Sequence, residues 1–273
     1  MKSRDMNRLF VLAIALFFSL LIPTQSFSAT INAASCSQSD VQAAIDAAND
    51  SDTVQIPAGT CTWTQTVNVG TQTGWTPPVY NTKAITIQGA GMDKTIIIDD
   101  IPVTQYNSGA MLSIATKLGG LIRVTGLTFD SLQIPKLDPD GYNRGMVGIA
   151  GYSQAWRMDH IHFIVGSGHG ITVSNFNYGV IDHNTFDLNG WHFGMYIYHD
   201  YWKGVPEGDG SWADDLHAGT EKAVFIEDNV FNASPFSVAI DGWSGGRAVL
   251  RHNTLNNSGI GAHGTDSPGR ART

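Results

Sequence analysis

A short apolar pattern repeats along the second half of the chain, and this repeat constrains the fold more than any other feature. Five segments share it, the last two more loosely: VIDHNTF (Val180 to Phe186), VFIEDNVF (Val224 to Phe231), VLRHNTL (Val249 to Leu255), RMDHIHF (Arg157 to Phe163) and RVTGLTF (Arg123 to Phe129). Phe163 and Phe186 lie 23 residues apart, and Phe231 and Leu255 lie 24 apart. A fixed spacing of this length is typical of proteins built from stacked repeats.

A second series of strand-like segments falls in phase with the first: Gly170 to Ser174, Gly194 to Tyr198, Ser237 to Asp241 and Gly259 to His263. One repeat of this size cannot bury its own apolar face. If successive repeats coil above one another, about 4.8 Å apart, every strand pairs with its neighbours and the core becomes continuous. The sequence therefore predicts an all-β solenoid, a parallel β-helix.

Alternation along each strand predicts which side chains face the core. The inward set is Ile171, Val173, Met195, Ile197, Ile240, Ile260 and Ala262, and the outward set is Thr172, Ser174, Tyr196, Tyr198, Asp241 and His263. In this prediction Ser174, Tyr198, Asp241 and His263 form one outward column. A slip of one residue in register would exchange the two sets.

The first 29 residues have the pattern of a secretory signal peptide. Basic residues at the start precede an apolar run from Leu9 to Ile22, and small residues follow at Ser28 and Ala29. We therefore expect an exported protein that is secreted, periplasmic or at the cell surface. Residues 30–111 are expected to form the N-terminal cap and first turns, and residues 112–273 the repeats. The polar ending from Gly264 to Thr273 predicts neither strand nor cap, so we expect a coil that is truncated at its C-terminus.

Cys36 and Cys61 are the two cysteines of the chain. In an oxidising compartment pairing is the default, with free thiols as the alternative. A disulfide closing a loop of this length is worth about 3 kcal/mol by chain entropy. Two cysteines alone do not provide the four ligands of a structural zinc site.

The net charge of the chain is −8, and removal of the leader, which carries +2, leaves −10. A surface this negative argues against nucleic acid or an anionic membrane as a partner. We therefore expect that the protein binds neither nucleic acid nor, after signal cleavage, a membrane. We also expect a monomer.

A helical segment near the N-terminus adds to the prediction. Ser39 or Asp40 can cap a helix that runs to about Asn49, and TVQIPAGTCTW follows up to Trp63. This arrangement resembles the capping helix and first turn of the pectin-lyase-like superfamily. The resemblance implies a single-stranded right-handed parallel β-helix with an N-terminal capping helix. It leaves the reaction open, because the superfamily includes lyases, hydrolases, esterases and non-catalytic adhesins.

Two sets of polar residues in the repeat are interpreted as structural. Asn184, Asn229 and Asn253 occupy one column, where stacked amides can satisfy one another's donors and acceptors. His160, His183 and His252 lie beside that column on successive turns, and we expect them to stack outward at the surface.

An aromatic stretch from Trp191 to Trp202 is the candidate binding surface. Flat aromatic faces stack on sugar rings, and their polar rims bind hydroxyl groups. A local hydrophobic lid is the equal alternative. The candidate substrate-binding residues are Tyr196, Tyr198, His199, Tyr201, Trp202, Trp243 and Arg247.

Asp241, His263 and Asp200 are the candidate catalytic residues. A carboxylate beside a histidine can carry out acid–base chemistry, and inverting hydrolysis of a glycoside needs two carboxylates, here Asp241 with Asp200 or Asp266. A β-elimination lyase would need a base, and the outward candidates are Lys203, Arg247 and Arg251. The alternative is a polar surface stripe without catalysis.

Two further segments leave alternatives open. The insertion from Lys203 to Lys222 is rich in Asp and Glu and suits Ca²⁺, or it is a solvated acidic loop; no cofactor is certain, and Ca²⁺ is the candidate. The Gly-His-Gly around His169 resembles a polygalacturonase motif, but the other motifs of that family are missing. We reject that assignment and keep His169 as a minor site candidate.

The sequence thus predicts an exported β-helix protein whose partner is a polysaccharide, which it binds and cleaves as a lyase or glycoside hydrolase. The alternatives are a non-catalytic surface adhesin or structural rod and, more remotely, a domain of a phage-tail-like fibre.

Overall fold

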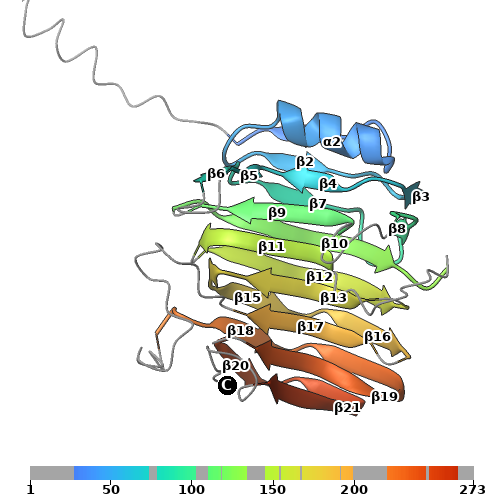
Figure 1. The fold of residues 1–273 in the computed structure, drawn as a ribbon. Helices are drawn as coiled ribbons and strands as arrows, with labels where there is room; N and C mark the ends of the chain where they lie inside the picture. The colour runs from blue at the N-terminus through green and yellow to red at the C-terminus, as the bar shows by residue number, and fades with distance from the viewer. Residues whose placement is uncertain are drawn as a thin grey trace, which may run out of the picture.

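The computed structural model describes residues 28–73, 79–102, 110–117, 119–133, 145–153, 155–166, 168–190, 192–198, 220–243 and 246–263. Its strands wind into stacked turns, with a helix at one end and β21 at the other (Figure 1). Strands of successive turns pair in parallel, so the chain is a parallel β-helix, as predicted. The described strands form three faces along the coil axis.

Each face is a ladder of paired strands. Face 1 comprises β1 (Thr30–Asn32), β2 (Thr53–Gln55), β7 (Thr86–Gln88), the first halves of β10 (Ile122–Asp130) and β12 (Trp156–Val165), β15 (Gly179–Asp182), β18 (Val224–Glu227) and β20 (Ala248–Arg251). Face 2 comprises β3 (Gly59–Trp63), β8 (Thr95–Asp99), the second halves of β10 and β12, β16 (Thr185–Asn189), and the first halves of β19 (Val230–Trp243) and β21 (Thr254–His263).

Face 3 comprises β4 (Val67–Val69), β9 (Leu112–Thr116), β11 (Gly145–Ser153), β13 (His169–Ser174), β17 (Phe193–Tyr198) and the second halves of β19 and β21. β14 (Phe176–Asn177) pairs with the end of β11. Outside this parallel network, β5 (Thr71–Thr73) and β6 (Val79–Asn81) form an antiparallel pair.

The core consists of columns of apolar side chains, one from each face. On face 2 the rings of Phe129, Phe163, Phe186 and Phe231 stack with centroids 5.8, 4.7 and 4.7 Å apart. Glycine on face 3 makes room for this stack, because a Cβ at Gly194 would lie 3.0 Å from the ring of Phe231. The repeat in the sequence is therefore the repeat of an aromatic column.

Most of the predicted inward set is confirmed. Ile171, Val173, Met195, Ile197 and Ile240 are buried in the core. Ile260 is 51% exposed, so its predicted burial is wrong. It occupies the same column as Ile240, but it lies in the last described turn, where no described strand covers it.

The helix α2 (Gln38–Ala47) covers the N-terminal end of the coil (Figure 1). It begins two or three residues earlier than predicted, because Ser37 is the N-cap and its Oγ accepts a hydrogen bond from the backbone N–H of Asp40 at 3.3 Å. Val41, Ala44 and Ile45 are its buried face. A cap of this kind shields apolar side chains that an open turn would expose.

The predicted disulfide between Cys36 and Cys61 is confirmed, and it ties the segment before α2 to β3. The indole Nε1–H of Trp63 donates to the carbonyl oxygen of Cys36 at 2.9 Å, which fixes the same junction. A disulfide indicates an oxidising environment. Among the described residues there is no helix of the length and hydropathy needed to cross a membrane.

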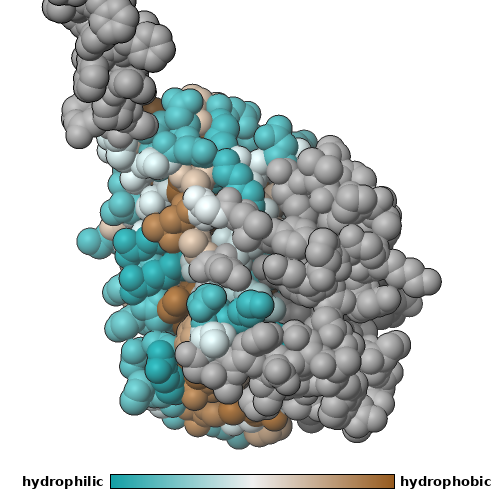
Figure 2. All heavy atoms as spheres, turned by 90° about the vertical axis from the view of Figure 1, so that its left-hand side faces the viewer, coloured by the Kyte–Doolittle hydropathy of each residue, from teal (hydrophilic) through white to brown (hydrophobic). Residues whose placement is uncertain are grey.

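The two ends of the coil differ. Figure 2 shows hydrophilic residues over much of the described surface and a hydrophobic region at the lower end, where β21 lies in Figure 1. Large apolar residues exposed at this end are Phe236, Leu255 and Ile260. The predicted signal peptide, apart from Ser28 and Ala29, and the polar segment from residue 264 onward lie outside the described residues.

Candidate functional site

The outward column on face 3 brings together two of the predicted site residues. The column contains one residue from each of four strands, paired in register: Thr172 on β13, Tyr196 on β17, Asp241 on β19 and Gly261 on β21. Alternation places these side chains outward because Ile171, Met195 and Ile240 on the same strands face the core. Tyr196 and Asp241, which are 45 positions apart in the sequence, thus become neighbours across one strand spacing.

Asp241 is fully buried, although it occupies an outward position. Its carboxylate extends over the next turn, where a Cβ at Gly261 would lie 2.8 Å from Oδ1. Glycine at position 261 therefore makes room for this carboxylate. A buried carboxylate beside an aromatic ring differs from the solvated surface stripe that we considered as the alternative.

His169 joins this group from the start of β13. It is buried, its ring stacks on that of Tyr196 with centroids 5.1 Å apart and planes 3° apart, and Phe193 meets it edge-on at 5.0 Å. His169, kept as a minor candidate, is thus next to Tyr196, which in turn is next to Asp241. The site thus contains a carboxyl, a phenol and an imidazole group, which are side chains that enzymes use for general acid–base catalysis.

The predicted alignment of Asp241 with Tyr198 and His263 is wrong by two residues. Tyr198 and His263 are both in register with Trp243 instead. At about 3.3 Å per residue along the strand and 4.8 Å between strands, Asp241 and His263 have backbones about 8 Å apart. Between β17 and β19 the strands pair at the same offset of 45 residues as Phe186 and Phe231, so the predicted pairing of Tyr198 with Asp241 was two residues out of phase with that spacing. Between β19 and β21 the register also shifts before Ile240, which brings Gly261 rather than His263 beside Asp241.

Several predicted site residues cannot be placed. The predicted site residues outside the described ranges are His199, Asp200, Tyr201, Trp202, Lys203, Asp266 and the candidate calcium insertion up to residue 219. For Tyr198, Trp243 and His263 the backbone is described and the side chain is not. Arg247 is buried rather than exposed, and Arg251 forms an ion pair with Glu227, with its Nε 2.6 Å from Oε1.

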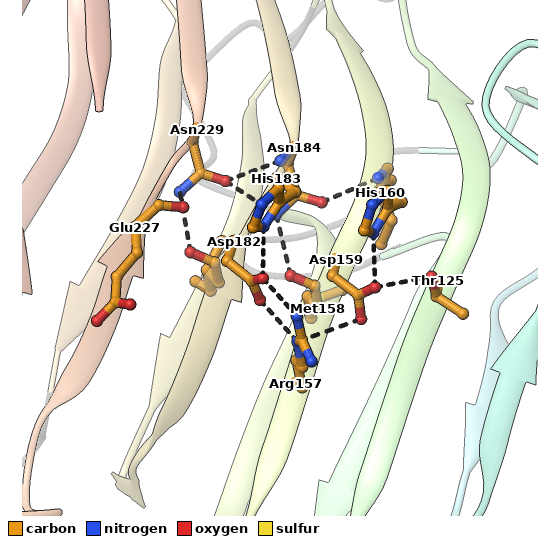
Figure 3. A network of polar contacts seen from close by, with 12 residues as sticks. Thr125, Arg157, Met158, Asp159, His160, Asp182, His183, Asn184, Glu227 and Asn229 are labelled. Atoms are coloured by element: carbon orange, nitrogen blue, oxygen red, sulfur yellow. Dashed lines mark hydrogen bonds and ion pairs between the residues drawn. The ribbon is translucent and has the colours of Figure 1, made fainter. Parts of the chain in front are cut away.

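The corner between faces 1 and 2 carries a charged network that the sequence analysis missed (Figure 3). Arg123 donates two hydrogen bonds of 2.7 Å to Asp159 on the next turn. Arg157 does the same to Asp182, at 2.8 and 2.6 Å. Each Arg thus reaches an acid two positions further along the strand one turn later. The signal in the sequence is the spacing Arg-x-Asp at Arg157 and Asp159.

This network is electrostatically satisfied, which favours a structural role. Burial alone would raise the pKa of Asp159, but hydrogen bonds with Arg123, His160 and Thr125 outweigh it and lower the pKa to about 2. The same balance, with Arg157 and His183 as partners, lowers the pKa of Asp182. Carboxylates held ionised by arginine are poor proton donors at neutral pH.

The two sets of residues interpreted as structural are confirmed in the main. Asn184 donates from Nδ2 to Oδ1 of Asn229 at 3.0 Å (Figure 3). Asn229 in turn donates to Oδ1 of Asn253 at 3.0 Å. His160 and His183 stack with ring centroids 5.3 Å apart and lie at the surface. His252 is also exposed.

A second unpredicted cluster lies on face 2. His162 contacts two carboxylates, with Nδ1 2.9 Å from Oδ1 of Asp93 and Nε2 2.8 Å from Oδ2 of Asp187. Asp93 comes from a turn 69 residues earlier in the chain, so no local spacing could reveal it. Within the described ranges, no group of three or more His, Cys, Asp or Glu residues converges to hold a metal ion.

Comparisons with known proteins assign no family. No family model matches the chain, and no curated protein matches it. Among solved structures, ORF18 of Geobacillus virus E2 is similar at 11% sequence identity with a TM-score of 0.38. The match covers 84% of this chain and 59% of that protein, so the chain spans less than two thirds of its length. The parallel β-helix rests on the strand pairing of the structure itself, and membership of the pectin-lyase-like superfamily stays a prediction.

Proposed function

We propose that the protein is exported, binds a polysaccharide along the outward surface of face 3 and cleaves it there. The observation that carries the proposal is the buried carboxylate of Asp241, in register with Tyr196 and over Gly261. An acid and a phenol on neighbouring strands can act on one sugar unit, because about 4.8 Å separates the strands.

Two reactions fit this arrangement. Asp241 is fully buried in the free protein, so hydrolysis requires that binding of the polysaccharide expose its carboxylate. Asp241 would then donate a proton to the glycosidic oxygen or activate the water that attacks the anomeric carbon. In β-elimination, a base would remove the proton α to a uronate carboxyl group, and the bond from the β carbon to the glycosidic oxygen would break as a carbon–carbon double bond forms. The leaving oxygen would take up a proton from water. Tyr196 and His169, whose rings stack, are the candidate groups for that base.

A screen for activity tests the proposal. The protein is incubated with pectate, alginate, chondroitin and xylan, and absorbance near 235 nm reports elimination while new reducing ends report hydrolysis. We expect one of these signals, and we expect Asp241→Asn to reduce the rate about 100-fold or more. Glu221→Gln, at an exposed position on the surface, is the matched control. Full activity of Asp241→Asn would remove this site from consideration.

Binding separates the enzyme from its alternative. Tyr196→Ala should weaken polysaccharide binding, since it removes the ring, whereas Tyr196→Phe keeps the ring and should affect turnover more than binding. Circular dichroism of each variant checks that the coil remains folded.

A non-catalytic rod or adhesin is the second candidate. It is favoured by ladders that run along the coil axis: the aromatic stack, the asparagine ladder and the Arg–Asp network all bind one turn to the next. Binding to a polysaccharide with no product in either assay would select this function over the enzyme.

A further inference from the structure

The imidazole of His162 lies between two carboxylates on the outside of face 2. The side chain is 17% exposed, on β12, and its two ring nitrogens point at Asp93 and Asp187. Asp93 lies in the turn before β8, and Asp187 lies on β16. The two carboxylates approach opposite sides of the ring, so the group does not share one point at which a metal ion could bind.

The protonation state follows from the chemistry of the contacts. A neutral imidazole has one N–H donor and one lone pair, and an ionised carboxylate is only an acceptor. Two carboxylates at 2.8 and 2.9 Å therefore need both ring nitrogens to carry hydrogen. Loss of one proton would set a lone pair against a carboxylate oxygen and abolish one of the two hydrogen bonds.

The contacts continue from turn to turn on both sides. Thr128, on β10, is bonded to Asp93, with its Oγ1 accepting from the Asp93 backbone N–H at 2.9 Å. On the other side, Asn232 on β19 donates to Oδ1 of Asp187 at 2.9 Å, and Asn256 on β21 donates to Oδ1 of Asn232 at 2.8 Å. His162 is thus the titratable link in a chain of side chains that reaches from the turn before β8 to β21.

We propose that His162 is a protonation-dependent clip that holds successive turns of face 2 together and loosens when its imidazole loses a proton. The charged groups that act on the ring are Asp93 and Asp187. Its strand neighbours, Thr128 and Thr185, are uncharged. The clip therefore responds to one ionisation and not to a distributed change of charge.

The direction of the response follows from the electrostatics. Burial lowers the pKa of His162, but hydrogen bonds to Asp93 and Asp187 outweigh it and raise the pKa above its ordinary value of 6.5. The contact with His162 is also the main cause that lowers the pKa of Asp93. A raised histidine pKa stabilises the fold fully below about 6.5, and this stabilisation is lost as the pH rises through the raised value.

Nitrogen NMR of the histidine rings tests the clip directly. In the full chain, His162 should carry protons on both nitrogens at pH 6.5 and titrate above that value. Asp93→Asn removes one negative charge at an exposed turn position with φ 60°, which asparagine tolerates. We expect the titration midpoint of His162 to fall in this variant. A midpoint at or below 6.5 in the wild type, or no change in the variant, would overturn the proposal.

Thermal unfolding gives a second readout. We expect His162→Gln to lower Tm by about 2–4 °C at pH 5.5, the effect of roughly 1 kcal/mol in a chain of this size, and by less than half of that at pH 9. His252→Asn, at an exposed corner position with φ 59°, is the matched control that removes a histidine from another place on the coil. A His162→Gln effect that does not change with pH would show that the residue contributes packing alone.

Discussion

At the scale of single residues, the polar side chains of the coil act as bridges between turns. Asn229 is an example, because its amide bonds Asn184, Asn253 and the backbone oxygen of Ile181 on neighbouring turns. Burial makes these contacts matter, since an unpaired buried amide or carbonyl group costs about 1–3 kcal/mol.

We therefore expect Asn229→Ala to lower the free energy of unfolding by about 2–4 kcal/mol, since several buried groups lose their partner together. Urea unfolding followed by circular dichroism measures the change. Asn256→Ala removes an amide from the exposed ladder on face 2 and should cost less than about 1 kcal/mol. Equal losses for the two variants would contradict the structural role of the buried ladder.

The charged network at the corner between faces 1 and 2 predicts that the stability of the protein falls at acidic pH. The pKa of Asp159 is lowered to about 2, so its contribution is complete above its unfolded value of 3.8 and is lost as the pH falls towards 2. That contribution is on the order of 2 kcal/mol, and about half of it should be gone at pH 3. Asp159→Asn should therefore destabilise the protein strongly at pH 7 and less at pH 3. Urea midpoints at the two pH values measure this, and a gap that widens in acid would contradict it.

At the scale of elements, the N-terminal cap and the repeating turns are held by different means. The turns rely on strand pairing and the aromatic column, whereas α2 buries one face and depends on the disulfide beside it. Each turn of a solenoid contacts its neighbours only, so a weakened cap should leave distant turns intact.

We expect the double variant Cys36→Ser, Cys61→Ser to lose about 3 kcal/mol of stability in the cap. Hydrogen exchange should accelerate in α2 and β3 while β13 and β17 keep their protection. Reducing agent should reproduce the effect in the wild type and have none in the variant. Loss of protection through all turns at once would show that the coil unfolds as a single unit.

At the scale of the whole molecule, α2 covers one end of the coil, and β21, the last strand of the described part of the chain, presents apolar residues at the other. One column contains both a buried and an exposed isoleucine, because Ile240 is buried between turns and Ile260 in the last described turn is 51% exposed. We expect Ile240→Ala to cost about 2–5 kcal/mol and Ile260→Ala less than about 1 kcal/mol, measured by urea unfolding. A large loss for Ile260→Ala would mean that this end is covered in solution.

The sequence predicted the fold because burial in a coil repeats with the turns: the aromatic column and the asparagine ladder are both visible as spacings. It failed where the strands depart from that regularity. The pairing of Asp241 with Gly261 follows register shifts between β19 and β21, and the partners of His162 meet only after several turns have wound between them. The predicted burial of Ile260 was wrong because alternation indicates which side of the strand a residue faces, and it does not indicate whether another turn covers that residue.

The corner between faces 1 and 2 limits how this sequence can change. On successive turns the residue at this corner has a φ between 53° and 70°; these residues are Gly126, His160, His183, Asp228 and His252. Glycine, asparagine, aspartate and histidine tolerate that left-handed conformation, whereas branched residues are strained there. Substitutions at the corner position of each turn are therefore limited to the few residue types that tolerate a positive φ, and this limit does not apply to positions with ordinary backbone angles.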